Sequence, residues 1–353
     1  ALGRTTEAGG EFLAAEGYAD ALDMARQCIY SPAVEAMEQG EYTTAAVMFA
    51  SISGYLDADD LRLQCLYLEA KAAIKDTEYQ RAISLLSKLP SDYEDVGTLL
   101  LDCRYLPAKA ALEREDYLIA ISLFQELGEY ADSEKLLQKA RYAYAGVLAE
   151  AGNLEEAATI YQSLGNYSRS AALYRQTRYN LASKYMTDGA YEQAAAIYEE
   201  LGTYMQSRNH LNECRYALAK AAYNDEDFAL AKERFTALGS YSDSRFMVKA
   251  CDYAMATLLM NSGRYAEAAE IFQSLETYED SAEMVSRCIY LQAEALLNEP
   301  EDREDHEDGT ESNAQRARDL FLSIGNYEDS LDRARSIDYA QADALLSAGD
   351  YTA

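Results

Sequence analysis

The sequence predicts an all-α fold, built as a solenoid of repeated helix pairs. Apolar residues make up 49% of the 353 residues and proline occupies only 4 positions, a composition that favours packed helices over strands or disorder. Tyrosines recur at a nearly constant interval, which is typical of a repeat protein. Between these tyrosines, apolar residues follow the spacing of amphipathic helices.

The repeat is defined by nine tyrosines, which we call the anchor tyrosines. They are separated by 37 or 38 residues, except for a last interval of 49 residues that contains a 12-residue insertion. An alanine stands three residues after each of them, and a second tyrosine series follows the same intervals in a linker that reads L-G-x-Y-x-D-S. The anchor tyrosines are Tyr30, Tyr67, Tyr105, Tyr142, Tyr179, Tyr216, Tyr253, Tyr290 and Tyr339.

Each unit contains a long first helix and a shorter second helix. The apolar spacing predicts a first helix over 280–298 and a second helix over 265–275. Asp280 stands where an N-cap is needed, and Glu283 three residues later completes the pattern of a capping box. We therefore expect the D-S of each linker to start a first helix. The recurring alanines favour close approach of helices, with bulky aromatic residues packed against them.

The motif G-x-Y-x-x-A-x-x-x-F-x-x-L, at Gly263, Tyr265, Ala268, Phe272 and Leu275, resembles the second helix of a tetratricopeptide repeat (TPR). The period is 37 residues rather than 34. The resemblance covers 3–351 and looks most like the tyrosine-rich arrays of bacterial proteins.

We therefore expect residues 1–353 to form a single TPR-like array of about nine 37-residue units. It should be a right-handed superhelical solenoid with nine first helices, eight second helices between them and a shorter N-terminal helix near 4–15. Both chain ends fall inside a unit, which favours a segment of a longer protein.

Charge and hydropathy exclude two classes of partner. With 61 acidic and 31 basic residues, the net charge of −30 repels phosphate backbones, so we expect no nucleic-acid partner. No apolar run approaches the length of a bilayer span, so we expect no direct membrane insertion of this segment.

Chemistry-bearing residues do not form a recognisable site. All six cysteines stand two residues before an anchor tyrosine, so we expect reduced, buried packing residues and, from their reduced state, a cytoplasmic protein. Ligand spacings such as C-x-x-C are absent, and His210 and His306 do not belong to a catalytic motif. We expect no enzyme activity, no metal site and no cofactor.

The insertion at 298–313 is strongly acidic. It holds eight acidic residues against Arg303. We interpret it as a solvated loop, with a docking site for a basic partner as the alternative.

Partner specificity should lie where the units differ, because residues common to every unit are explained by packing. The residue before the anchor tyrosine is arginine in four consecutive units, and lysine recurs four residues after the anchor. In TPR arrays the first helices line the concave groove, so the resemblance implies a basic stripe there; the alternative is pairing with nearby acids of the same chain. These candidate residues are Arg104, Arg141, Arg178, Arg215, Lys71, Lys109 and Lys220.

The sequence thus predicts a non-catalytic scaffold that binds a peptide or helix of a partner protein in its concave groove. The alternative is a structural spacer or stalk that positions domains outside this segment.

Overall fold

The structure is a computed structural model, which describes residues 2–15, 18, 20–299 and 312–348. Within these ranges every regular element is an α-helix, and there are 18 of them. The all-α prediction is therefore confirmed for the described chain. Most of the acidic insertion, including His306, and the last turn at 349–351 lie outside the described residues.

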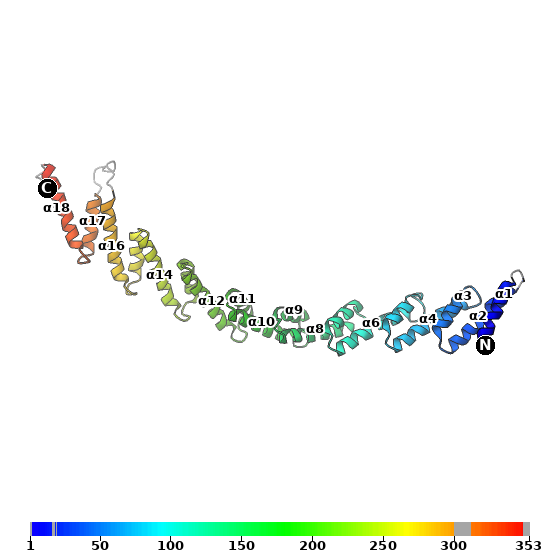
Figure 1. Ribbon diagram of the computed structural model, residues 1–353. Helices are drawn as coiled ribbons and strands as arrows, with labels where there is room; N and C mark the ends of the chain where they lie inside the picture. The colour runs from blue at the N-terminus through cyan, green and yellow to red at the C-terminus, as the bar shows by residue number, and fades with distance from the viewer. Residues whose placement is uncertain (1, 16–17, 19, 300–311, 349–353) are drawn as a thin grey trace. The chain divides into compact units, whose positions relative to one another are not determined.

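First and second helices alternate along the chain (Figure 1). The described part contains the expected nine first helices and eight second helices, preceded by the short α1 (Leu2–Ala14). The first helices are α2 (Ala21–Glu38), α4 (Ala58–Lys75), α6 (Val96–Glu113), α8 (Ser133–Glu150), α10 (Ser170–Thr187), α12 (Ser207–Asn224), α14 (Ser244–Asn261), α16 (Ser281–Asn298) and α18 (Ser330–Ala348). The second helices are α3 (Tyr42–Ser51), α5 (Tyr79–Leu86), α7 (Tyr117–Leu127), α9 (Leu154–Leu164), α11 (Tyr191–Leu201), α13 (Phe228–Leu238), α15 (Tyr265–Ser274) and α17 (Asn313–Ser323).

The chain forms two compact units, Ala1–Thr177 and Arg178–Ala353, whose boundary falls within α10. Inside each unit, a helix packs mainly against the helix before it and the helix after it. This pattern is that of a helical solenoid, in which each repeat covers the apolar face of its neighbour.

The core repeats one arrangement in which a small residue faces a large one. In the cluster formed by α6, α7 and α8, Ala108, Ala120 and Ala140 are fully buried around the ring of Phe124. Equivalent aromatic rings, including Phe49, Phe235 and Phe272, are also fully buried. Alanine allows the helix backbones to approach closely while the aromatic ring fills the space between them.

The aspartate that precedes most of the first helices does not act as the sequence predicts. Asp280 stands at the N-cap of α16, but its side chain makes no capping hydrogen bond, and its backbone angles of φ −97° and ψ 23° are not the extended ones that capping requires. Its carboxylate instead accepts a hydrogen bond of 2.6 Å from the hydroxyl of Tyr253, in the preceding first helix. The predicted capping box is therefore wrong.

We call this contact the Tyr–Asp bridge, and it recurs along the array. Each bridge ties an anchor tyrosine to the start of the next first helix, and the tyrosine ring also packs edge-on against an aromatic residue of the second helix or the linker between them. The bridges are Tyr30–Asp57, Tyr67–Asp95, Tyr105–Asp132, Tyr216–Asp243, Tyr253–Asp280 and Tyr290–Asp329.

Two successive anchor tyrosines lack this bridge because the aspartate is replaced. Arg169 occupies the position after Tyr142, and the Tyr142 hydroxyl has no hydrogen-bond partner among the described residues. Gln206 occupies the position after Tyr179, whose hydroxyl lies 3.1 Å from Nε2 of His210 instead. The ring of His210 also lies 5.2 Å from that of Tyr198, and its Nδ1 is 2.9 Å from Glu213.

The cysteines are free thiols, and five of them are buried as the sequence predicts. Cys28 is only partly buried, which corrects the expectation for that residue. Its neighbour on α1 is Gly9, where an added Cβ would lie 3.4 Å from the Cys28 side chain. Because glycine offers no side chain there, Cys28 keeps some contact with solvent.

Candidate partner-binding surface

The three candidate lysines lie over the rings of their own anchor tyrosines. The Nζ atoms of Lys71, Lys109 and Lys220 are 5.0, 5.5 and 5.9 Å from the ring centroids of Tyr67, Tyr105 and Tyr216. An ammonium group at this distance from a ring face makes a cation–π contact. Each lysine also stays exposed, so one side of the ammonium group remains open to solvent.

Two of the four arginines form ion pairs within the chain. Arg178 pairs with Glu200, and Arg215 lies 2.9 Å from Glu199. Both glutamates belong to the second helix α11. The intramolecular alternative therefore holds for these two guanidinium groups.

The other two arginines, Arg104 and Arg141, have no carboxylate partner among the described residues. Arg104 is exposed on α6, and Arg141 is half-buried on α8, the next first helix. Both belong to the first compact unit. Among the described residues, they are the two candidate arginines without a carboxylate partner.

The position before the anchor tyrosine lies at the seam with the second helices. Where it holds an aspartate, the preceding second helix supplies a cation: Lys232 is 2.6 Å from Asp252, and Arg318 pairs with Asp338. At the position equivalent to Lys232, the helices before Arg104 and Arg141 carry Ile83 and Ile121. The residue before the anchor tyrosine thus forms an ion pair with the preceding second helix in some repeats. Arg104 and Arg141 form no such pair among the described residues.

Arginines and lysines do not form one stripe. On α6 and α12, the two helices that carry both kinds, they stand five positions apart, which places them about 140° apart around the helix axis. The contacts agree with this separation, because Arg215 reaches a second helix whereas Lys220 lies over the anchor ring of its own helix. The seven candidate residues therefore divide into an arginine set at the helix seam and a lysine set beside the anchor tyrosines.

Charge is distributed unevenly between the two kinds of helix near the middle of the chain. The first helix α10 carries Arg175, Arg178 and Lys184 and no acidic residue. The second helix α11 carries Glu192, Glu199 and Glu200 and no basic residue. In a chain of net charge −30, the charged residues of this first helix are thus all basic and those of the following second helix are all acidic.

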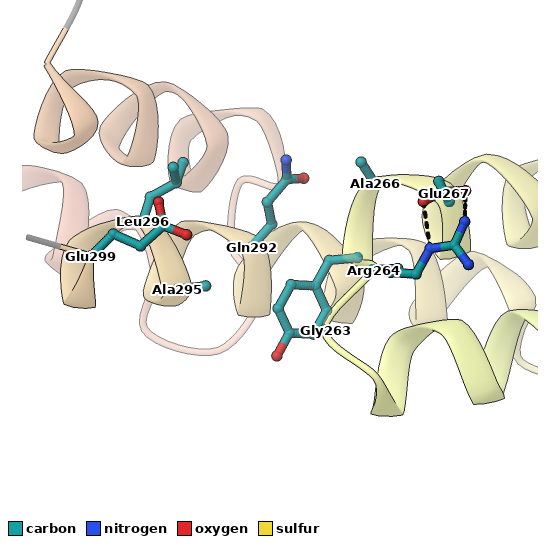
Figure 2. Close-up of a pocket in the computed structure, with 9 residues that line it drawn as sticks. Gly263, Arg264, Ala266, Glu267, Gln292, Ala295, Leu296 and Glu299 are labelled. Atoms are coloured by element: carbon teal, nitrogen blue, oxygen red, sulfur yellow. Dashed lines mark hydrogen bonds and ion pairs between the residues drawn. The ribbon is translucent and has the colours of Figure 1, made fainter. Parts of the chain in front are cut away.

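A recurring hollow at the turn between the helices of a pair was not predicted. It lies between the start of a second helix and the C-terminal half of the next first helix, and has volumes of about 230, 330 and 480 Å³ in three repeats. Figure 2 shows the hollow beside α15, where Arg264 pairs with Glu267 and Gln292 projects from α16. The sequence does carry a signal for this hollow, because the residue two positions after the anchor tyrosine differs between repeats. In these three repeats it is Glu69, Tyr144 and Gln292.

The described residues contain neither a cluster of metal ligands nor a membrane-spanning helix. Across the described ranges, His, Cys, Asp and Glu do not gather in groups of three or more suited to a metal ion. Among the described helices, none combines the length and apolarity needed to cross a bilayer.

These features define the class of protein: a helical solenoid of helix-turn-helix repeats with a period of about 37 residues. No family model matches the chain, and no curated protein matches it. A solved structure described as the TPR domain of P58(IPK) does match, with 15% identity over 99% of each chain and a TM-score of 0.23. The assignment to the class therefore rests on the helices and repeats of the chain itself.

Proposed function

We propose that the protein is a non-catalytic interaction scaffold that binds an acidic peptide or helix of a partner protein, as a single array in which the first helices line the binding groove. Arg104 and Arg141 are the residues through which it holds the partner. The single observation that carries this proposal is that both lack a carboxylate partner among the described residues, although the chain has 61 acidic residues.

An arginine without an ion-pair partner is available to bind an acidic group of another protein. A guanidinium group donates two parallel hydrogen bonds to a carboxylate, so a carboxylate of a partner is the group that fits it best. Equivalent positions on successive first helices carry the two arginines, so one extended or helical segment reaches both. The exposed ammonium groups of Lys71, Lys109 and Lys220 provide further, weaker contacts. Arg178 and Arg215 contribute only if they leave their ion pairs with Glu200 and Glu199 to bind the partner.

The test compares two double variants of the same array. The purified chain is used to recover partners from extracts of its source, and affinities for a recovered protein are then measured by fluorescence anisotropy. We expect R104A/R141A to weaken binding at least tenfold, or about 1.4 kcal/mol. R178A/R215A is the matched control and should weaken binding less, because these side chains are already paired.

Two results would contradict the proposal. Equal affinities of wild type and R104A/R141A, with unchanged helical content by circular dichroism, would show that the two arginines do not hold the partner. Recovery of no partner by the intact array would favour the alternative role as a spacer.

A further inference from the structure

The hollow between α7 and α8 differs in chemistry from its two counterparts. It measures about 480 Å³ and is lined by Leu118 and Ile119 of α7 and by Val147 of α8. The exposed fractions of these three side chains are 63%, 55% and 48%. Single exposed aliphatic residues are ordinary, but three around one hollow form a contiguous apolar patch.

The equivalent positions in another repeat show that the fold does not need this patch. Beside α3, Leu118 and Ile119 are replaced by Thr43 and Thr44, and Val147 by Ala72. The polar groups that line that hollow are paired within the chain, because Glu69 accepts hydrogen bonds from Thr43 at 2.6 Å and from Arg81 at 2.8 Å. Packing of the repeat therefore does not account for the apolar residues beside α7.

Two tyrosines complete the apolar lining. Tyr117 begins α7, and Tyr144 takes the place that Glu69 occupies in the polar hollow. Both are half-buried, and burial raises the pKa of the Tyr117 hydroxyl. Half-buried aromatic rings present large, stiff surfaces that enclose an apolar side chain at a small cost in conformational entropy.

Charge around the hollow favours a basic occupant. Glu115 and Asp116 lie at its edge, immediately after the C-terminal end of α6, where the helix dipole is negative. Arg114 pairs with Asp116 at 3.1 Å and leaves Glu115 as the more available carboxylate. A second copy of this chain, with a net charge of −30, would be repelled from this place.

We propose that the hollow between α7 and α8 docks a segment of a partner protein that presents a large apolar side chain next to a lysine or arginine. The apolar side chain enters between Leu118, Ile119 and Val147, and the basic group lies against Glu115. This goes beyond the proposed function, with which it shares only the premise that the array binds proteins. The surface and the charge of the occupant are both different.

The experiment uses a phage-displayed library of random 12-residue peptides as the probe. The full chain is the target, and L118T/I119T is the counter-target. These substitutions copy Thr43 and Thr44, which the same fold already carries at the equivalent positions, so the variant should keep its helical content. Selected peptides are then synthesised, and their affinities for wild type, L118T/I119T, E115Q and R104A/R141A are compared.

We expect selected peptides to combine a large apolar residue with lysine or arginine. They should bind L118T/I119T at least tenfold more weakly than wild type, lose a smaller factor with E115Q and remain unaffected by R104A/R141A. The proposal is overturned if no peptide discriminates wild type from L118T/I119T, or if the discriminating peptides are acidic. It is also overturned if the wild-type chain forms a dimer that L118T/I119T abolishes, since the occupant would then be a second copy. Peptides that depend on Arg104 and Arg141 alone would support the proposed function and contradict this inference.

Discussion

The anchor tyrosine combines two kinds of contact in one side chain. The ring of Tyr253 lies 5.2 Å from Phe272 and 5.9 Å from Tyr278, and its hydroxyl donates to Asp280. The rings hold the two helices of a repeat together, whereas the hydroxyl reaches the next repeat. Removal of the hydroxyl alone therefore isolates the contribution of the Tyr–Asp bridge from that of ring packing.

We expect Tyr253→Phe to lower the free energy of unfolding by about 1–2 kcal/mol, because the lost hydrogen bond has an ionised acceptor. Urea denaturation followed by circular dichroism measures the change. Tyr142→Phe is the matched control, since the Tyr142 hydroxyl has no hydrogen-bond partner among the described residues, and it should change stability little. Equal losses in both variants would show that the bridge contributes nothing.

Arg169→Asp should create a bridge where the chain lacks one. Asp at this position matches Asp132 and Asp243 of the bridged repeats, so its carboxylate should accept the Tyr142 hydroxyl. We expect a gain of about 1 kcal/mol in the free energy of unfolding, the usual net contribution of one hydrogen bond. The gain should vanish when Arg169→Asp is combined with Tyr142→Phe; a gain that persists would come from the charge change instead.

At the scale of the element, the bridges make the junctions between first helices sensitive to alkaline pH. The hydrogen bond to Asp132 raises the pKa of Tyr105 to about 12, and that to Asp280 raises the pKa of Tyr253 to about 12. An unfolded tyrosine has a pKa of about 10. The folded chain therefore keeps protons that the unfolded chain loses, so this stabilisation is complete below pH ~10 and is lost between pH ~10 and ~12.

The measurement is the free energy of unfolding across that pH range, with the ultraviolet absorbance of tyrosinate recorded in parallel. The double variant Y105F/Y253F should show a smaller alkaline loss than wild type. Identical pH profiles would mean that these two hydroxyls are not held as protonated donors.

The helices could be predicted from the sequence because their signals are local and repeated. The ranges predicted over 265–275 and 280–298 differ by one residue from α15 and α16. The Tyr–Asp bridge could not be predicted in this way. The residues around Asp280 predict an N-cap, whereas its hydrogen-bond partner, Tyr253, lies 27 residues earlier on another helix. The contacts of the lysines with the anchor rings were not predicted, although Lys109 follows Tyr105 by one helical turn.

The candidate site was only partly predictable for a related reason. A sequence gives the position of each arginine within its repeat. It does not give the ion-pair partners of the arginine, because these depend on how the second helices pack. Glu199 and Glu200 are adjacent in the sequence, yet they serve arginines of two different first helices, α12 and α10. The hollow beside α7 could not be predicted, because it depends on the exposure of the Leu118 and Ile119 side chains. That exposure is determined by how the helices pack.

At the scale of the whole molecule, the array owes its stability to contacts between neighbours in the chain. Helices contact mainly the preceding and following helices, and within the described residues no pairing of distant segments closes the structure. The free energy of unfolding is then close to the sum of the stabilities of the single repeats and of the contacts between neighbouring repeats, as in other solenoids. A variant should therefore weaken its own junction and the adjacent repeats, and leave remote repeats unchanged.

The replacement of aspartate by Arg169 and Gln206 makes the strength of the junctions uneven. In a one-dimensional chain of coupled repeats, the junction between α8 and α10 is a weak link, where partial unravelling starts in the interior rather than only at the ends. At the junction between α10 and α12, the Tyr179 hydroxyl instead lies within hydrogen-bond distance of His210. Amide hydrogens near the C-terminal half of α8 and the start of α10 should therefore exchange with deuterium faster than those at equivalent places in α4 and α6. Mass spectrometry of peptic fragments would reveal such an interior minimum of protection, and a uniform profile would contradict it. The array would then behave as stable groups of repeats joined by a weaker coupling at residue 169.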